Sequence, residues 1–250
     1  MIFNDRIHDI DKVKNEIDQY RPLPAVIIPL LKEYFRIGLT YSSNALEGNT
    51  LTETETKVIL EDGLTIGGKS LKEHFEVIGH SKAYDFMMSK ASDTTISEED
   101  ICALYRFFYY LIDEENAGHY RKVPVFVTGT DFEFPKPAQV PVLMGEFAQE
   151  IPYLKEKYHP VHYAAIIHAK LATIHPFIDG NGRTARLLMN LALLQSGYSV
   201  TIIPPIMRNA YISAIRQANK GAMKPFLEFI SEMVYESSKE YLRLIKSAQP

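Results

Sequence analysis

Helix-starting signals recur along this sequence and constrain its fold more than any other feature. Thr52 and Ser70 each stand three residues before a glutamate, and Ser97 precedes the acidic residues 98–100. In such pairs the hydroxyl and the carboxylate satisfy backbone amides of the first turn that have no partner inside the helix. Pro160 also suits a first turn, because the amide hydrogen that proline lacks is not needed there. The chain is therefore predicted to be built mainly of helices.

The spacing of apolar residues supports that prediction over most of the chain. Residues 161–172 place apolar or small side chains at helical intervals, a second helix is predicted over 183–196 before Gly197, and the last 50 residues have the same character. Segment 123–134 differs, because β-branched and aromatic residues alternate in it around a central turn. It predicts a β-hairpin, which we expect to form a small flap over about 123–135. The predicted fold class is a mainly α-helical bundle with that hairpin flap and no large sheet.

Composition favours one compact domain. Of the 250 residues, 46% are hydrophobic and 23% are charged, which excludes a largely disordered chain. We expect an N-terminal helical region over 1–65, a core over 66–200, and C-terminal helices over 201–250 packed on that core. The formal net charge of −4 gives no basis for general nucleic-acid binding or for attachment to a membrane surface.

Cellular location is suggested by three features. The N-terminus turns acidic at Asp5 and has no signal-peptide core. The longest relevant apolar stretch, 23–31, contains two prolines and is far shorter than the roughly 20 residues of a membrane-spanning helix. Cys102 is the only cysteine, so no internal disulfide can form and a reducing compartment is favoured. We expect a cytoplasmic protein. The sequence leaves open whether it forms a homo-oligomer.

Residues 63–70 match the Gly-x₄-Gly-Lys-Ser pattern of P-loop nucleotide hydrolases. That motif works between a buried parallel strand and a helix. The segment before Gly63 follows a helix-starting pair and carries charge throughout, so it predicts a helix and not a strand. We therefore interpret 63–70 as a glycine-rich turn before a capped helix.

Two further groups of residues invite other binding sites. His159, His162 and His168 suggest zinc, but they lack the Glu-flanked i, i+4 histidine pair and any cysteine partner. We interpret them as histidines of a helix surface or of the core. The aromatic residues within 105–110 are interpreted as core and not as a base-stacking platform, because the chain is acidic overall.

The most informative segment is 174–186, a short loop that leads directly into a helix. Its Gly180-Asn181-Gly182 run permits positive φ and close backbone approach, so its amides can form a nest for an anion. The helix dipole favours the same charge. Arg183 and Arg186 are three residues apart on one helical face, where their planar groups can hold further phosphate oxygens.

Two more residues of this loop have side chains suited to catalysis. Asp179 could bind Mg²⁺ through one carboxylate while phosphates supply other ligands. His175 has the one side chain here whose ordinary pKa suits a base near neutral pH. The residues alone thus predict a polyphosphate–metal site with a general base.

The run from His175 to Arg186 resembles the Fic family motif, His-x-Phe-x-(Asp/Glu)-Gly-Asn-Gly-Arg-x-x-Arg, at every defined position. Residues 118–121, Gly-His-Tyr-Arg, and the segment after them are similar to the family's Gly-x-Tyr-Arg and flap, so the resemblance covers about 70–200. Tyr105 departs from it, since members often carry histidine there. Fic proteins typically transfer AMP from ATP to a protein hydroxyl, so the resemblance implies a protein adenylyltransferase that uses Mg²⁺ and ATP.

The same resemblance implies roles for individual residues. His175 would take the proton from a Ser, Thr or Tyr of the target protein, and Asp179 would bind Mg²⁺. The 180–182 nest would hold the phosphates, and Arg183 and Arg186 the leaving pyrophosphate. The target would dock on the flap by strand addition. The remaining implied nucleotide contacts, near the adenine and in the flap turn, are Tyr211, Ile212, Asn219, Thr130 and Asp131.

A second motif lies ahead of this core. The run Ser43-Asn-Ala-Leu-Glu47-Gly48 resembles the Fic inhibitory motif, (Ser/Thr)-x-x-x-Glu-(Gly/Asn). The plain alternative is a helix end with Glu47 in solvent and Gly48 as its cap. The resemblance implies instead that Glu47 pairs with Arg186 and keeps it from the γ-phosphate, so that the enzyme inhibits itself.

Two alternatives to a self-inhibited adenylyltransferase stay open. One is removal of AMP from a modified protein at the same site, with Glu47 orienting the attacking water. The other is a regulatory module that binds nucleotide with little turnover. The motifs do not identify the target protein or the preferred hydroxyl.

Overall fold

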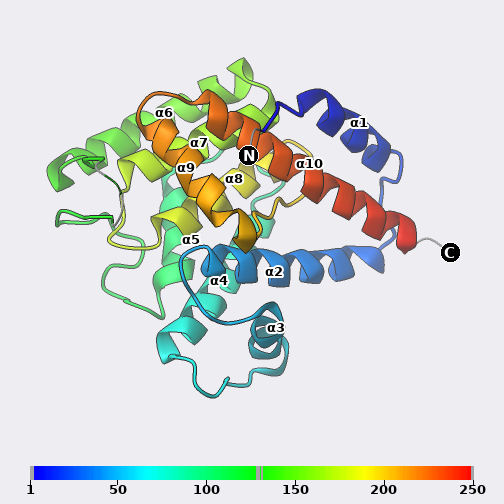
Figure 1. The fold of residues 1–250 in the computed structure, drawn as a ribbon, viewed down its shortest axis with the longest axis horizontal. Coiled ribbons are helices and arrows are strands. Elements are labelled where there is room, and N and C mark those ends of the chain that lie inside the picture. The colour runs from blue at the N-terminus through cyan, green and yellow to red at the C-terminus, as the bar shows by residue number, and fades with distance from the viewer. Residues whose placement is uncertain (1–2, 128–129, 131, 249–250) are drawn as a thin grey trace.

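The computed structural model describes residues 3–127, 130 and 132–248, and within them the chain is a bundle of helices with no strand (Figure 1). None of the helices in this described part is long and apolar enough to cross a bilayer. The mainly helical fold class is thereby confirmed. The α-helices are α1 (Ile7–Asp18), α2 (Ile27–Ala45), α3 (Glu53–Asp62), α4 (Leu71–Ser89), α5 (Glu98–Tyr109), α6 (Val140–Lys157), α7 (Pro160–Ile174), α8 (Asn181–Gln195), α9 (Arg208–Asn219) and α10 (Lys224–Ser247), with short 3₁₀ turns at Pro137–Gln139 and Pro205–Met207.

Local signals start three of these helices where they were predicted. The hydroxyls of Thr52, Ser70 and Ser97 each accept a hydrogen bond from the amide three residues later, at the start of α3, α4 and α5. The acidic side chain at that later position bonds back to the amide of the cap. Pro160 lies in the first turn of α7. These starts are predictable because the capping box needs only residues of a single turn.

The turn at 63–70 joins two helices. Gly63 ends α3 with a φ of 67°, a conformation that favours glycine, and Ser70 caps α4. A helix therefore precedes this glycine-rich segment, where a P-loop needs a strand, which agrees with the interpretation from sequence.

Helices α7 and α8 form the centre of the bundle and pack closely on each other. All but three residues of α8 are buried, and the buried ones include Arg183 and Arg186. A helix buried on all sides is normally apolar. Its two arginines therefore need polar partners from neighbouring elements, and these partners define the site described below.

One large apolar core includes residues from all three regions distinguished in the sequence. Ile10 of α1, Tyr84 of α4 and Phe229 of α10 are fully buried in it. Helix α1 lies against α10 (Figure 1). Helix α2 contacts α8 through its last turn, where the Ser43 carbonyl accepts from Arg186. A smaller cluster of Leu51, Ile59 and Val77 attaches α3 to α4.

The prediction of a hairpin flap over 123–135 is wrong, because the described residues of this segment form no strand. Residues 128–129 and 131, where the predicted turn falls, lie outside the described residues. Pro124 and Pro135 have no amide hydrogen to donate to a ladder, and a ribbon of two strands alone is only marginally stable in water. Both ends of the segment are held by the Arg121 side chain instead, which donates to the carbonyls of Val123 and Pro135.

Candidate active site

His175 directly follows α7 and has left-handed backbone angles, φ 51° and ψ 57°. No other described non-glycine residue has a positive φ. Its Nδ1 atom lies 3.2 Å from the carbonyl oxygen of Ala172. Because a carbonyl can only accept, the proton belongs on Nδ1, and Nε2 is left as the basic nitrogen.

Burial lowers the pKa of His175 to about 4. The Ala172 carbonyl and the carboxylates of Glu47 and Asp179 favour the protonated ring, whereas the positive charge of Arg121 disfavours it. The imidazole is therefore neutral at neutral pH, which is the state that a general base requires.

The loop after His175 is held by its own side chains. Phe177 is fully buried and stacks on Tyr105, with 3.9 Å between ring centroids. Asn181 is also buried: its Oδ1 accepts from the Phe177 amide at 2.9 Å, and its Nδ2 donates to the Phe177 carbonyl at 2.8 Å. The Asn181 side chain therefore fixes the loop, which leaves its backbone amide as the group suited to an anion.

A side chain at either glycine of the loop would meet a close neighbour, but in different ways. Gly180 has a φ of 74°, and a Cβ on it would lie 2.5 Å from the Phe108 ring. Gly182 has ordinary helical geometry in the first turn of α8, but a Cβ on it would lie 2.3 Å from Oε1 of Glu47. The carboxylate of Glu47 thus lies against the helix N-terminus where the sequence predicts a phosphate.

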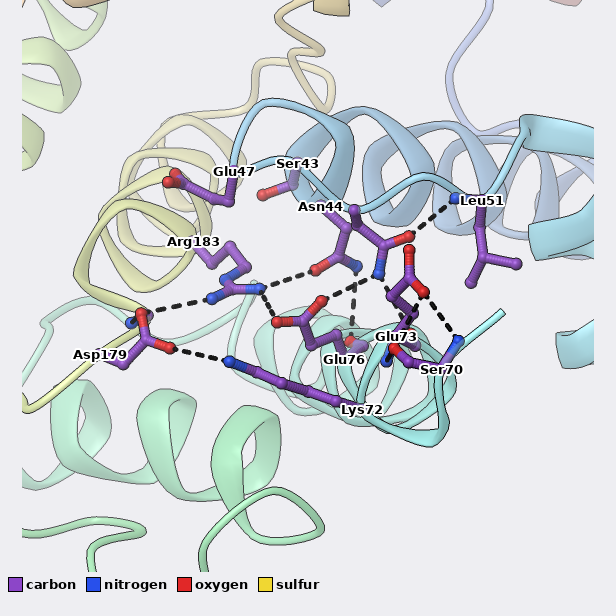
Figure 2. A network of polar contacts seen from close by, with 12 residues as sticks. Ser43, Asn44, Glu47, Leu51, Ser70, Lys72, Glu73, Glu76, Asp179 and Arg183 are labelled. Atoms are coloured by element: carbon purple, nitrogen blue, oxygen red, sulfur yellow. Dashed lines mark hydrogen bonds and ion pairs between the residues drawn. The ribbon is translucent and has the colours of Figure 1, made fainter. Parts of the chain in front are cut away.

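Asp179 projects beside this nest and is partly open to solvent. Its Oδ1 accepts from the Gly180 amide at 2.6 Å, and its Oδ2 lies 3.8 Å from Nζ of Lys72 (Figure 2). The described residues contain no group of three or more His, Cys, Asp or Glu side chains placed to hold a metal. A single accessible carboxylate next to a phosphate site still fits Mg²⁺, which commonly takes one or two carboxylates and completes its shell with phosphates and water.

Arg183 is almost completely buried and is held by partners that the sequence did not suggest. Its guanidinium lies 2.9 Å from Oε1 of Glu76 on α4 and 3.4 Å from Oδ1 of Asn44 on α2 (Figure 2). It also lies over the Phe108 ring, 4.5 Å from the centroid. Glu76 is in turn fixed by the Asn49 amide at 2.9 Å. The one signal in the sequence was the carboxylate of Glu76 within the α4 segment. Glu76 lies among buried residues of that helix, and only the fold brings it next to Arg183.

Arg186 has only 1% of its side chain exposed and donates to three residues. Its Nε donates to the Ser43 hydroxyl at 2.9 Å, one terminal nitrogen to the Ser43 carbonyl at 2.8 Å, and the other to the Tyr211 hydroxyl at 3.1 Å. Its ion pair is with Oε1 of Glu47 at 2.7 Å. The contact between Glu47 and Arg186 that the motifs implied is therefore present.

Glu47 is ionised in this pair although its surroundings exclude much water. The loss of water would raise the pKa of its carboxyl, but the charges of Arg186 and Arg183 and the hydrogen bond from Arg186 outweigh that effect and lower it. The side chain is still 34% exposed. Glu47 is thus an anion at the helix N-terminus that keeps a route to solvent.

Of the residues expected near the adenine, only Ile212 lines the pocket formed beside Arg208 and Arg216. Tyr211 is buried, and its hydroxyl is shared between Arg186 and Nε2 of His168, which lies 3.0 Å away. Asn219 accepts a hydrogen bond from Thr173 at 2.8 Å, and Ile212 packs against the main core. Thr130 accepts from the Phe132 amide, and Asp131 lies outside the described residues.

The histidines that suggested zinc have separate structural partners. His168 is part of the core beside Tyr211, whereas His159 and His162 each lie within ion-pair distance of an aspartate near the N-terminus, Asp11 and Asp5. Each carboxylate provides an ordinary structural partner for its histidine.

Comparison with known proteins connects this geometry to a family. Residues 95–193 match the model of the Fic/DOC family. A curated relative from Drosophila willistoni named "Protein adenylyltransferase Fic" is 39% identical over 207 residues, covering 81% of this chain and 41% of the relative. The relative of the same name from Drosophila grimshawi is 35% identical over 240 residues, 95% of this chain and 49% of its own. The chain thus spans about half the length of these relatives or less.

Solved structures match this chain over nearly its whole length. Residues 134–508 of Fic-1 from C. elegans superpose with a TM-score of 0.87 at 30% identity, covering 97% of this chain and 72% of that one. A Fic domain containing signaling protein from Bacteroides thetaiotaomicron also gives 0.87, at 27% identity, with 98% and 99% covered. By its motif, its helices and these relatives, the chain belongs to the Fic/DOC family.

Proposed function

We propose that this chain is a self-inhibited protein adenylyltransferase that moves AMP from ATP to a side-chain hydroxyl of a protein, itself included. The observation that carries the proposal is the arrangement at the start of α8, where a neutral histidine, an accessible aspartate and two buried arginines surround one anion site. The name of the relatives from Drosophila supports the same activity.

The reaction needs a base and a place for the leaving group. Nε2 of His175 takes the proton of the hydroxyl as the oxygen attacks the α-phosphorus. The bond from that phosphorus to the bridging oxygen breaks, and pyrophosphate leaves with the electron pair. The amides of Asn181 and Gly182 with Arg183 and Arg186 stabilise its charge. Mg²⁺ held by Asp179 would neutralise phosphate charge while bound.

Inhibition follows from the place of the Glu47 carboxylate. It pairs with Arg186 and lies against Gly182, so a distal phosphate of ATP has to displace it. Glu47→Gly should therefore raise AMP incorporation about 5- to 150-fold, the usual range of such coupling. Adding Arg186→Ala should remove most of that gain, because the group that is set free is then absent.

The test is labelling with ATP carrying its label on the α-phosphate, followed by intact-mass measurement of the chain. Glu47→Gly should carry AMP, whereas Glu47→Gly with His175→Ala should not. Glu115→Gly, at an exposed glutamate of a turn, serves as the matched control and should label like the native chain. Absence of AMP from Glu47→Gly and from every protein of a lysate incubated with it would contradict adenylyl transfer.

A second activity at the same site is supported by the unused oxygen of Glu47. Only Oε1 takes a hydrogen bond among the described residues, so Oε2 could orient a water that removes AMP from a modified protein. In that case Glu47→Gly would abolish removal of AMP from a pre-labelled target while leaving its attachment intact.

A further inference from the structure

Arg121 is a buried cation that none of the steps above uses. It is 2% exposed, and no carboxylate of the described residues lies within ion-pair distance of it. Burial alone lowers its pKa. An ionised group out of water is costly unless it is well hydrogen-bonded, so the bonds that this side chain makes indicate why it is there.

Its donors bond to three separate stretches of chain. Nε donates to the carbonyl of His175 at 2.7 Å, and the terminal nitrogens donate to the carbonyls of Val123 at 3.2 Å and Pro135 at 2.6 Å. Its backbone amide donates to the carbonyl of Pro176 at 2.9 Å. One residue therefore joins the catalytic loop to both ends of the 123–135 segment.

The carbonyl of His175 is the contact with most consequence for catalysis. A left-handed backbone is unfavourable for a residue with a Cβ, and a residue before proline is steered toward extended conformations. His175 meets both conditions, since Pro176 follows it. A charged donor on its carbonyl helps to hold this conformation, which sets where the imidazole lies.

We propose that Arg121 is a positioning residue: its fork holds the backbone of His175 in the left-handed conformation and ties it to both ends of the 123–135 segment. The base and the segment over which a target would dock then keep a fixed relation. This inference rests on the proposed function, because it assigns the geometry to AMP transfer.

The charge of Arg121 adds an effect that a purely structural residue would not have. The charges that act on the imidazole are the cation of Arg121 and the carboxylates of Glu47 and Asp179. The Ala172 carbonyl lies at Nδ1, and the Phe134 ring lies 4.3 Å away between centroids. Removing the cation favours the protonated ring, so the pKa of His175 should rise. Lysine keeps the charge, but its donors are on a single nitrogen and cannot reproduce the planar fork by which three nitrogens of Arg121 reach three carbonyls.

The experiment compares Arg121→Lys, Arg121→Met and, as matched control, Arg6→Met, which removes a half-buried arginine that pairs with Glu232 of α10. The His175 ring is titrated by NMR in the native chain and in each variant, without nucleotide. Self-labelling is measured against ATP concentration and pH in the Glu47→Gly background. Thermal unfolding identifies variants that fail to fold.

Both Arg121 variants should lower kcat about 10- to 100-fold with the KM for ATP within about threefold, since a displaced base costs rate. Only Arg121→Met should raise the His175 pKa and move the acid limb of the rate profile to higher pH. Arg6→Met should change neither quantity.

An unchanged kcat in both Arg121 variants overturns the proposal, and so does a His175 titration that is the same in Arg121→Met as in the native chain. Failure of the proposed function is separate: the Glu47→Gly parent would then carry no AMP, while the NMR titration would still decide whether Arg121 governs His175.

Discussion

Replacing Gly182 by alanine should bring a methyl group on α8 into steric conflict with the Glu47 carboxylate. The added Cβ would lie 2.3 Å from Oε1 of Glu47 and 3.2 Å from a terminal nitrogen of Arg186. The first distance is shorter than any stable contact, so one side has to move. The carboxylate is the end of a flexible side chain and the helix backbone is not. We therefore expect Gly182→Ala to fold normally and to push Glu47 away from Arg186.

Two opposing contributions set the size of this effect. Alanine is better than glycine inside a helix by up to about 1 kcal/mol. A charge-assisted hydrogen bond contributes about 1.5–3 kcal/mol, and solvent around the partly exposed Glu47 reduces its loss to about 1–2 kcal/mol. In the native chain Gly182→Ala should therefore lower the free energy of unfolding by about 0–1 kcal/mol. In the Glu47→Gly chain only the gain is left.

The assay is a double-mutant cycle read by thermal and urea unfolding. The two backgrounds should differ in their response to Gly182→Ala by about 1–2 kcal/mol, or about 2–8 °C in a domain of this size. Gly67→Ala is the control, because a Cβ there has open space and an ordinary φ, so it should act alike in both backgrounds. Equal responses to Gly182→Ala would refute the placement of the carboxylate.

Three other outcomes are expected. His175→Ala should lower AMP transfer about 10²- to 10⁴-fold while calorimetry finds ATP binding within several-fold of the native value; native-like labelling would remove His175 from its role. Arg183→Ala should reduce kcat/KM about 10- to 150-fold through a lost charge-assisted contact of about 1.5–3 kcal/mol; an unchanged value would mean that Glu76 keeps Arg183 from the phosphates. The lowered pKa of Glu47 gives stability that is present above its ordinary pKa of 4.5 and is lost as pH falls through the folded value; Glu47→Gln should flatten that part of the stability curve, and an identical pH dependence would contradict it.

The parts of the fold that the sequence predicted correctly depend on short-range rules. The starts of α3, α4 and α5 follow from residues within one turn. The 180–182 loop likewise contains the backbone conformation and close approach that its two glycines suggested. Such features need no knowledge of the rest of the chain.

The hairpin prediction failed because alternation indicates that one face of a segment is buried and does not by itself establish strand pairing. Segment 123–135 has the β-like pattern, yet it has prolines near both ends, and the part of the chain that the structure describes supplies no third strand to stabilise a ladder. Its polar backbone is instead satisfied in part by Arg121, which the pattern of the segment itself does not contain.

Apart from Glu47 and the nearby Asp179, which lies 3.6 Å from Arg183, the partners of the two motif arginines could not be found from sequence. Glu76 and Asn44 lie more than 100 positions from Arg183 and are joined to it only by the packing of α2 and α4 on α8. Tyr211 was assigned to the adenine on the resemblance alone, and the structure places its hydroxyl on Arg186. Long-range polar contacts of this kind follow from burial of charge and not from local pattern.

On the proposal that Glu47 inhibits the enzyme, the contacts of Arg186 indicate what has to move when inhibition is relieved. Ser43 and Tyr211 hold its guanidinium through three hydrogen bonds that do not involve Glu47. When the Glu47 carboxylate leaves, Arg186 is still fixed, but it is then a buried cation with neutral partners, which increases its affinity for an anion. A phosphate can take the vacated position without rearrangement of α8. The movement needed is therefore confined to the end of α2, where Glu47 is one-third exposed and Gly48 has a φ of 98°. On this proposal, release of Arg186 from Glu47 requires movement of that turn.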